Sequence, residues 1–253
     1  MTVAEARGGR HDAGAALAPS PLALHDVHAG YGRIEVLHGV DIRVRDGEVT
    51  ALLGPNGAGK TTALSVMSGL LVPTSGCRHV GGWHVNDASA DELARIGICH
   101  VREGRSVFPN LSVADNIAVA SSAGSDVGHI RDIAFSLFPR LAERRTQLAG
   151  TLSGGEKQML ALACGLGVEP SVLLVDELSM GLAPLVVTEL YEAVAAVAAS
   201  GVAVLVVEQF ATIGLQFSSQ VYVMAGGRVT YSGASGAALD AVHDAYLGPG
   251  SGP

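Results

Sequence analysis

A glycine-rich segment followed by a lysine and two hydroxyls has the clearest chemistry in this sequence. It follows the apolar run 48–53 and reads G-P-N-G-A-G-K-T-T at 54–62. Glycines let successive backbone N–H groups converge on phosphate oxygens, and a helix that starts there adds its positive end. Because the expected strand before it and helix after it are the context this motif needs, the segment predicts a phosphate-binding loop. We expect phosphate contacts at Gly54, Pro55, Asn56, Gly57, Ala58, Gly59, Lys60, Thr61 and Thr62.

Three side chains of this loop have separate expected roles. Lys60 should reach the β- and γ-phosphates of a nucleoside triphosphate, and the Thr61 hydroxyl should bind Mg²⁺. Thr62 can donate a hydrogen bond to the α-phosphate. The loop alone indicates only a nucleotide-binding protein.

An acidic pair supplies the groups that hydrolysis would need. Asp176 and Glu177 end the aliphatic run 172–175. A carboxylate at the C-terminal end of a strand lies at the sheet edge beside the phosphates, so Asp176 is expected to bind Mg²⁺. Glu177 is expected to orient or deprotonate the attacking water. Alone, such a pair is often a turn or a helix cap; beside the phosphate loop it predicts catalysis, with Lys60 assisting.

A third segment, L-S-G-G-E-K-Q at 152–158, places a serine and two glycines before an expected helix. Such a turn offers a hydroxyl, exposed N–H groups and a positive helix end to an anion. Ser153 is also an ordinary N-cap, with Glu156 at the position that completes a capping box. The two roles are compatible.

The expected elements place these segments in one α/β domain. Residues 22–44 alternate apolar and polar side chains, which predicts short strands in an antiparallel layer. Strands at 48–53, 98–101, 172–175 and 202–207 alternate with helices and predict a parallel core. Residues 112–149 have helical periodicity and would form an inserted subdomain. We therefore expect a flexible tail at 1–21, one domain at 22–240 with a helical subdomain at about 104–165, and a C-terminal tail at 241–253.

Composition limits the possible partners. The 253 residues include 48% hydrophobic residues and carry a formal net charge of -8, which argues against a dedicated nucleic-acid binder. Cys77, Cys99 and Cys164 have no metal or disulfide spacing and are expected to be small buried hydrophobes. The longest apolar stretch, 193–207, is broken by Ser200-Gly201 and is too short to span a bilayer. Any link to a membrane must then come from a partner.

The phosphate loop, the L-S-G-G-E-K-Q segment and the acidic pair follow one another in this order along the chain. In this order they resemble the ATP-binding subunits of ABC transporters, and the resemblance covers roughly residues 22–235. The resemblance implies a P-loop NTPase (RecA-like) core with an antiparallel β layer and an inserted α-helical subdomain. It also implies ATP and Mg²⁺ as cofactors and a dimer of two ATPase subunits, either two copies of this chain or this chain with a second ATPase. Ser153, Gly154 and Gly155 would then face the γ-phosphate held by the opposing subunit, and Tyr31 would stack on adenine.

Several positions depart from the general family pattern. Glu103 stands where a glutamine usually contacts Mg²⁺, and glutamate can also bind that ion. Gln209 replaces the usual switch histidine; it can donate a hydrogen bond to the γ-phosphate but takes up no proton near neutral pH. Ala183 stands in the D-loop, residues 179–184, where aspartate is common. Leu178 and Cys164 replace a proline and an arginine.

Other segments resemble one branch, the shorter ATPase of branched-chain (hydrophobic) amino acid importers. They are R-E-G-R at 102–105, F-P-N-L at 108–111, F-P-R-L at 138–141 and V-E-Q at 207–209. The branch implies two membrane permeases, a solute-binding protein as an indirect partner, and a peripheral location on the cytoplasmic face of the membrane. Residues 108–113 and the helices after them would dock the permease. Urea and amide importers share much of the pattern, and a regulatory subunit that binds ATP but hydrolyses it weakly is a further alternative. ABC ATPases that act on ribosomes or DNA usually carry tandem cassettes, coiled-coil insertions or basic segments, which this sequence does not show.

Overall fold

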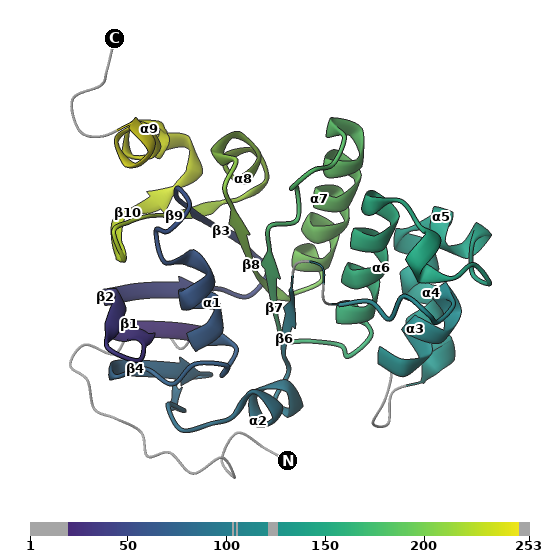
Figure 1. Ribbon diagram of the computed structural model, residues 1–253, viewed down its shortest axis with the longest axis horizontal. Coiled ribbons are helices and arrows are strands. Elements are labelled where there is room, and N and C mark those ends of the chain that lie inside the picture. Colours follow the sequence, from purple (N-terminus) through teal and green to yellow (C-terminus); the bar gives the residue numbers. More distant parts are fainter. Residues whose placement is uncertain (1–19, 103, 105, 121–125, 248–253) are drawn as a thin grey trace.

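The computed structural model describes residues 20–102, 104, 106–120 and 126–247. Figure 1 shows three regions: an antiparallel sheet, a central parallel sheet, and a block of helices on the far side of that sheet. This arrangement confirms the expected α/β core with an antiparallel layer and a helical part. In the described residues, no helix combines the length and apolar character needed to cross a membrane.

The central sheet has six strands in the order β10-β9-β3-β8-β7-β6. All neighbouring pairs are parallel except β9 and β10, which form an antiparallel hairpin near the end of the chain. Parallel strands put their carboxyl ends at one edge, which is where the phosphate loop and the acidic pair follow their strands. The bounds are β3 Val49–Leu53, β6 Ile98–Val101, β7 Val172–Asp176, β8 Ala203–Glu208, β9 Gln220–Ala225 and β10 Arg228–Ala234.

The second sheet is antiparallel, in the order β2-β1-β4-β5. Its strands are β1 Leu22–Tyr31, β2 Ile34–Val44, β4 Ser75–Val80 and β5 Trp83–His84. The expectation of short strands is wrong for β1 and β2, which have 10 and 11 residues. Their pairing continues through several register shifts, so bulges absorb the irregular alternation that suggested breaks.

Helices cover both faces of the central sheet. Helix α1 packs against β1, β2 and β7, whereas α6 packs against α3, α4, α5, α7 and β6. Figure 1 shows α1 and α6 on opposite sides of β6, β7 and β8. The helices are α1 Lys60–Met67, α2 Ala90–Arg95, α3 Val113–Ala120, α4 Val127–Leu137, α5 Pro139–Glu143, α6 Gly154–Leu166, α7 Pro184–Ala199, α8 Ala211–Phe217 and α9 Leu239–Leu247, with 3₁₀ turns at Ala149–Thr151 and Ser235–Ala237.

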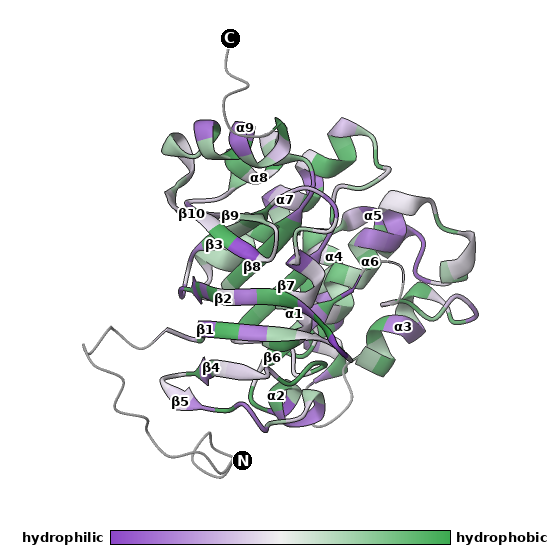
Figure 2. Ribbon diagram, turned by 60° about the vertical axis from the view of Figure 1, so that its left-hand side comes forward, coloured by the Kyte–Doolittle hydropathy of each residue, from purple (hydrophilic) through white to green (hydrophobic). Residues whose placement is uncertain are grey.

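Alternation along the buried strands divides the core into two clusters. Leu52 lies in the cluster with α1 and the antiparallel sheet, while Ala51 and Leu53 lie in the cluster with the helical block. This division follows from the two-residue period of a strand, which sends successive side chains to opposite faces. Figure 2 shows the strands of the parallel sheet as mostly hydrophobic, as expected for a sheet buried on both faces.

The expected C-terminal tail at 241–253 is partly wrong. Residues 239–247 form α9, which packs against β9 and β10. Ala241, Val242 and Ala245 face the core, although no residue of α9 is fully buried. So small an apolar stripe is a weak helix signal in a sequence, because most of its stabilisation comes from packing on the sheet. Residues 248–253, and residues 1–19 of the expected N-terminal tail, lie outside the described part of the chain.

Candidate nucleotide site

The phosphate loop connects the end of β3 to the start of α1. Gly59 is the N-cap of α1 and has a left-handed backbone, with φ of 101°. Gly54 has no room for a side chain, because a Cβ there would overlap the carbonyl oxygen of Met224 in β9. Gly227 N–H donates to Ala58 O at 3.1 Å, so the β9–β10 turn holds the far side of the loop. The loop is therefore a cradle held between the β9–β10 turn and the start of α1.

Lys60 is buried at the base of this cradle, with 5% of its surface exposed. Its Nζ donates to Gly54 O at 2.8 Å and to Pro55 O at 3.2 Å. Burial lowers the pKa of Lys60, and the nearby carboxylates of Glu177, Asp176 and Glu208 act in the opposite direction. The acidic pair is thus close enough to Lys60 to interact with it electrostatically.

The acidic pair lies where β7 ends, next to β8. Asp176 is the last residue of β7, and Glu177 N–H donates to Val207 O at 3.0 Å. Glu177 has φ of 47°, a left-handed conformation that is unfavourable for a residue with a side chain. Such backbone strain, of order 1–3 kcal/mol, gathers at functional sites where the surrounding structure maintains it. The surrounding structure therefore maintains Glu177 in a conformation that its local preference disfavours.

These donors suit a nucleoside triphosphate with a magnesium ion. The Gly54 N–H donates to Tyr246 and the Ala58 N–H to Pro55 O, so in this structure neither is free for the phosphate contact expected of it. The other N–H groups of the loop and the Lys60 ammonium match phosphate oxygens, and the Thr61 hydroxyl and the Asp176 carboxylate are hard oxygen ligands of the kind that Mg²⁺ prefers. Thr61 is exposed, whereas Thr62 is buried in α1 with 7% of its surface exposed.

The segment 152–158 lies at the start of α6. It belongs to the core cluster of the helical block and not to the cluster that contains α1. Ser153 is the N-cap, its side chain accepts from Glu156 N–H, and Glu156 completes the capping box, as expected. Ser153 and Gly154 are exposed. Gly155 is buried, and a Cβ there would lie 2.5 Å from Val186 Cγ1 in α7. The second glycine thus serves close helix packing, while the residues before it face outward.

The other positions singled out by the sequence lie on separate elements. Tyr31 is at the end of β1 and is 55% exposed, which leaves its ring accessible. Gln209 directly follows β8. Ala183 is the N-cap of α7 and makes no side-chain capping bond. Glu103 lies outside the described residues.

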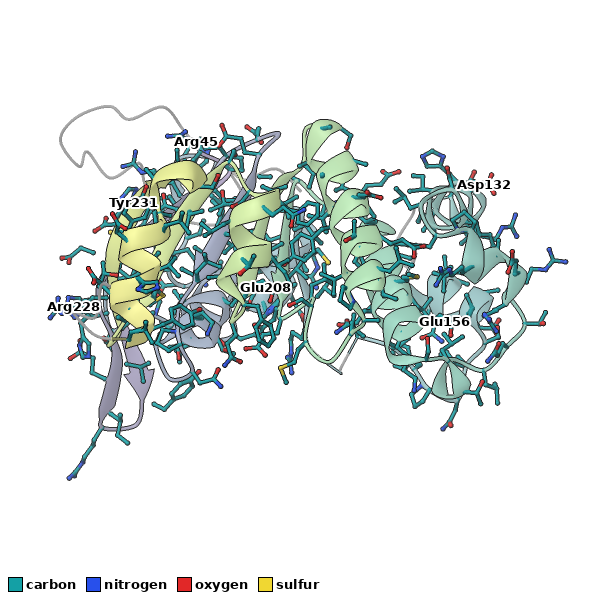
Figure 3. The ribbon with its side chains drawn as sticks, turned by 90° about the horizontal axis from the view of Figure 1, so that it is seen from above. Arg45, Asp132, Glu156, Glu208, Arg228 and Tyr231 are labelled. Atoms are coloured by element: carbon teal, nitrogen blue, oxygen red, sulfur yellow. The ribbon has the colours of Figure 1, made fainter. Side chains whose placement is uncertain are left out.

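A buried glutamate beside Gln209 was missed by the sequence reasoning. Glu208 is 1% exposed and accepts hydrogen bonds from Ser179 N–H at 3.0 Å, Ser179 Oγ at 2.6 Å and Tyr191 Oη at 2.6 Å. Figure 3 shows it in the middle of the molecule. Burial raises the pKa of Glu208, while these hydrogen bonds oppose that shift. The glutamate therefore ties β8 to the D-loop and to α7.

Tyr246 of α9 was also missed. Its hydroxyl accepts from Gly54 N–H at 3.1 Å and lies 2.6 Å from the carbonyl oxygen of Gln209. Its only sequence signal is an aromatic residue in a stretch expected to be a tail.

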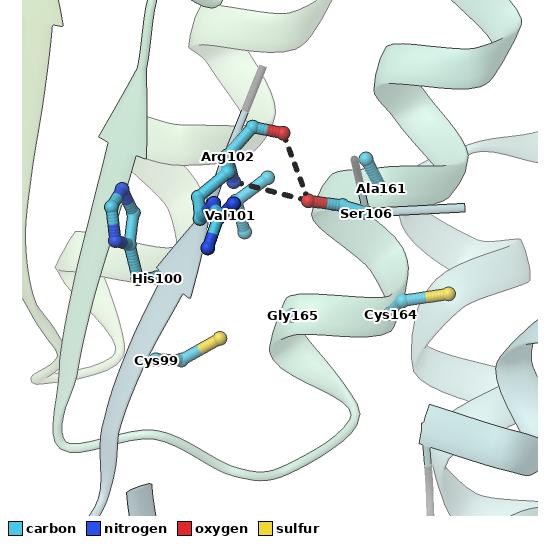
Figure 4. A pocket seen from close by; sticks show the side chains of 8 residues that line it. All are labelled: Cys99, His100, Val101, Arg102, Ser106, Ala161, Cys164 and Gly165. Carbon is cyan, nitrogen blue, oxygen red and sulfur yellow. Dashed lines mark hydrogen bonds between the residues drawn. The ribbon is translucent and has the colours of Figure 1, made fainter. Parts of the chain in front are cut away.

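A cavity of about 470 Å³ lies between β6 and α6, lined in part by Cys99, Arg102 and Cys164. Figure 4 shows His100 on the opposite side of β6 from Cys99. Burial raises the pKa of the Cys99 thiol to about 11 and that of Cys164 to about 12, so both thiols stay neutral. All three cysteines are partly buried, with Cys99 and Cys164 packed against the core, so the expectation of full burial is corrected to partial burial.

One group of side chains outside this site has the composition of a metal site. His28, Glu35 and His38 have ligand atoms within 4.8 Å of one another, the only such group of three in the described residues. His28 Nδ1 is hydrogen-bonded to Glu35 at 2.5 Å, and His38 Nδ1 lies 3.6 Å from the other Glu35 oxygen. These contacts are those of a polar cluster on the surface of the β1–β2 hairpin.

Fold and site together define a P-loop nucleotide-binding cassette. A family model described as ABC transporter matches residues 37–179. The high-affinity branched-chain amino acid transport ATP-binding protein BraG of Pseudomonas aeruginosa is 38% identical over 231 residues, covering 90% of this chain and 99% of BraG. The probable branched-chain amino acid transport ATP-binding protein LivF of Archaeoglobus fulgidus is 31% identical over 217 residues, covering 85% of this chain and 92% of LivF.

A solved structure supports the fold independently. The ADP conformation of an ATP-binding cassette of an ABC transporter superposes with a TM-score of 0.79 at 24% identity, covering 90% of this chain and 98% of the other. The chain belongs to the ABC transporter family and is an ATP-binding, ATP-hydrolysing subunit of such a transporter. Cassettes of this family dimerise and associate with permease components.

Proposed function

We propose that this subunit powers the import of branched-chain or other hydrophobic amino acids. The observation that carries the proposal is the match to BraG, which extends over 99% of that protein at 38% identity. LivF, a second relative with the same printed activity, matches over 92% of its length. Relatives with other printed cargoes match at lower identity than BraG: the lipopolysaccharide export ATPase LptB of Acidithiobacillus ferridurans is 31% identical over 96% of its length, and the iron importer ATPase FbpC of Mesorhizobium japonicum is 32% identical over 62%.

In this proposal each site residue has one role in hydrolysis. Lys60 and the loop N–H groups bind the phosphates, and Tyr31 stacks on adenine. Thr61 and Asp176 hold Mg²⁺, with Glu103 as a further oxygen ligand. When bound, the ion neutralises charge that develops on the phosphates.

The remaining roles concern the attacking water and the γ-phosphate. Glu177 accepts the proton of that water. Gln209 donates a hydrogen bond to the γ-phosphate of its own site. The exposed start of α6, Ser153 to Gly155, does the same for the opposing subunit in a dimer. This division is supported by the packing of α1 and α6 on opposite sides of the parallel sheet.

The assembly we propose contains two ATPase subunits and two permeases, on the cytoplasmic face of the membrane, with a solute-binding protein acting through the permeases. Residues 108–113 are the proposed permease contact. A cavity of about 480 Å³ lies beside them, lined in part by Val107, Pro109, Gly150 and Met180. Phe108 is 57% exposed at this place, as a side chain that contacts a partner would be.

Purification of the chain with its membrane partners tests the proposal. We expect permease subunits to co-purify, and leucine, isoleucine or valine with the solute-binding protein to stimulate ATP hydrolysis. A Phe108→Ala variant should lose the permeases while retaining ATP binding. Stimulation by urea or a short amide instead would assign the chain to that class of importer. Tight ATP binding without turnover in the full assembly would assign it a regulatory role.

A further inference from the structure

The C-terminal helix reaches two parts of the nucleotide site through a single side chain. Tyr246 Oη lies 3.1 Å from Gly54 N and 2.6 Å from Gln209 O. A phenol has one proton and can also accept, so it must donate to the carbonyl and accept from the amide. The result is a hydrogen-bonded path from the first residue of the phosphate loop, through α9, to the residue at the switch position.

Two contacts hold Gln209 in place: one at its own backbone carbonyl, and one at the side chain of Glu208, the residue before it. The carbonyl of Gln209 is fixed by Tyr246, while the side chain of Glu208 is fixed by the D-loop and α7 through Ser179 and Tyr191. These two contacts fix the backbone of Gln209, and therefore the base of its side chain, relative to the phosphate loop. A displacement of about 1 Å at such a residue is costly for a reaction that depends on geometry.

Few large apolar side chains attach α9 to the rest of the protein. Leu239 and Leu247 at its two ends are 65% and 60% exposed. Only small or medium side chains of α9 (Ala241, Val242 and Ala245) pack against the core cluster. The Tyr246 hydroxyl is therefore a specific polar contact of a helix that is otherwise loosely packed.

We propose that Tyr246 is a positioning residue, whose hydroxyl holds Gln209 in place relative to the phosphate loop. The C-terminal helix then contributes to ATP hydrolysis without touching the nucleotide. This inference rests on the proposed role of Gln209 at the γ-phosphate, and it is independent of which solute is transported.

A double-mutant cycle on the full-length chain tests it, with Tyr246→Phe, Gln209→Ala and the double variant. Tyr246→Phe keeps the ring and removes the hydroxyl. We expect kcat for MgATP to fall about fivefold, the effect of one lost hydrogen bond, with KM changed less than about twofold. In the Gln209→Ala background the same change should have no further effect, because Tyr246 acts through Gln209.

Tyr231→Phe is the matched control. The Tyr231 hydroxyl donates to Ala234 O at 2.9 Å in β10, so it is an equivalent hydroxyl deletion within one hairpin. We expect its kcat to equal that of the wild type, and thermal unfolding should confirm that all variants are folded.

Three outcomes would overturn the proposal. Unchanged kcat in Tyr246→Phe would show that the hydroxyl only docks α9. Additive losses in the double variant would show that Tyr246 acts elsewhere. Unchanged kcat in Gln209→Ala would remove the residue through which Tyr246 is proposed to act, and with it the role of Gln209 in the proposed function, while leaving the transport assignment in place.

Discussion

At the scale of single residues, environment separates carboxyl groups of similar chemistry. Glu177 is at the open end of β7 in a strained backbone, whereas Glu208 is enclosed by Ser179 and Tyr191. These positions suit Glu177 to its proposed catalytic role and Glu208 to holding the D-loop and β8 together.

Replacement of Glu177 by glutamine should lower kcat for ATP hydrolysis by about 100-fold or more, because a general base of this kind contributes that much. Nucleotide affinity should remain, since Lys60 and the loop N–H groups are untouched. Phosphate release and fluorescent-nucleotide binding measure the two quantities. Glu169→Gln is the matched control, because Glu169 also has a left-handed backbone, with φ of 49°, and is exposed. Equal losses in both variants would contradict the assignment.

Glu208 should make stability depend on pH with a known sign. Its pKa is raised above the ordinary value of 4.5 by burial, so the native state binds more protons than the unfolded state in the window above 4.5. Stability contributed by this group is present below that window and is lost as the pH rises through it. The melting temperature of Glu208→Gln should therefore rise relative to that of the wild type as the pH is raised from the ordinary glutamate pKa toward neutrality.

The opposite trend is expected for Glu92→Gln. Hydrogen bonds from Ser89 lower the pKa of Glu92, so its contribution is present above the ordinary pKa and is lost on acidification. Its variant should become less stable relative to wild type as the pH rises. Parallel trends in the two variants would show that the burial of Glu208 is not responsible.

At the scale of elements, the packing of α6 on α7 fixes the direction in which the segment at Ser153 faces. Gly155 is the close contact, with Val186 directly opposite. Its neighbour Gly154 has ordinary space, since a Cβ there would lie 3.4 Å from Leu182.

Gly155→Ala should destabilise the protein by about 1–3 kcal/mol, the usual cost of overpacking. Gly154→Ala is the matched control and should cost less, because no atom must move. Val186→Ala combined with Gly155→Ala should restore part of the stability by opening space. Chemical denaturation measures all four proteins, and equal effects of the two alanines would contradict the packing argument.

At the scale of the whole molecule, the start of α6 and the phosphate loop pack against different core clusters, one on each face of the parallel sheet. In the proposed dimer each chain therefore lends its α6 segment to the other chain's phosphates. A Lys60→Ala chain keeps the segment at Ser153, and a Ser153→Arg chain keeps the phosphate loop.

Mixing these two inactive variants should recover part of the ATPase activity, because a mixed dimer contains one complete site. Each variant alone should stay inactive at the same total concentration. The Lys60→Ala chain alone, at the total protein concentration of the mixture, is the matched control for nonspecific concentration effects. Failure of the mixture, with both variants folded, would contradict a site shared between two copies of this chain.

The chemistry of the site and the class of the fold followed from local sequence. The glycines at 54–59, the acidic pair and the serine cap at Ser153 each form a short contiguous motif, so their order and spacing predict a nucleotide-binding α/β domain. Strands β7 and β8 were also predictable, because buried parallel strands appear as continuous apolar runs.

Only the tertiary structure revealed Glu208 and Tyr246 as parts of the site. Tyr246 meets Gly54 across 192 positions of the chain, and Glu208 meets Ser179 across 29. No local pattern encodes such pairs, since they form only where distant segments converge at the carboxyl edge of the sheet. The helix α9 was missed for the same reason: its small apolar stripe is stabilised by a surface that exists only once the sheet has folded.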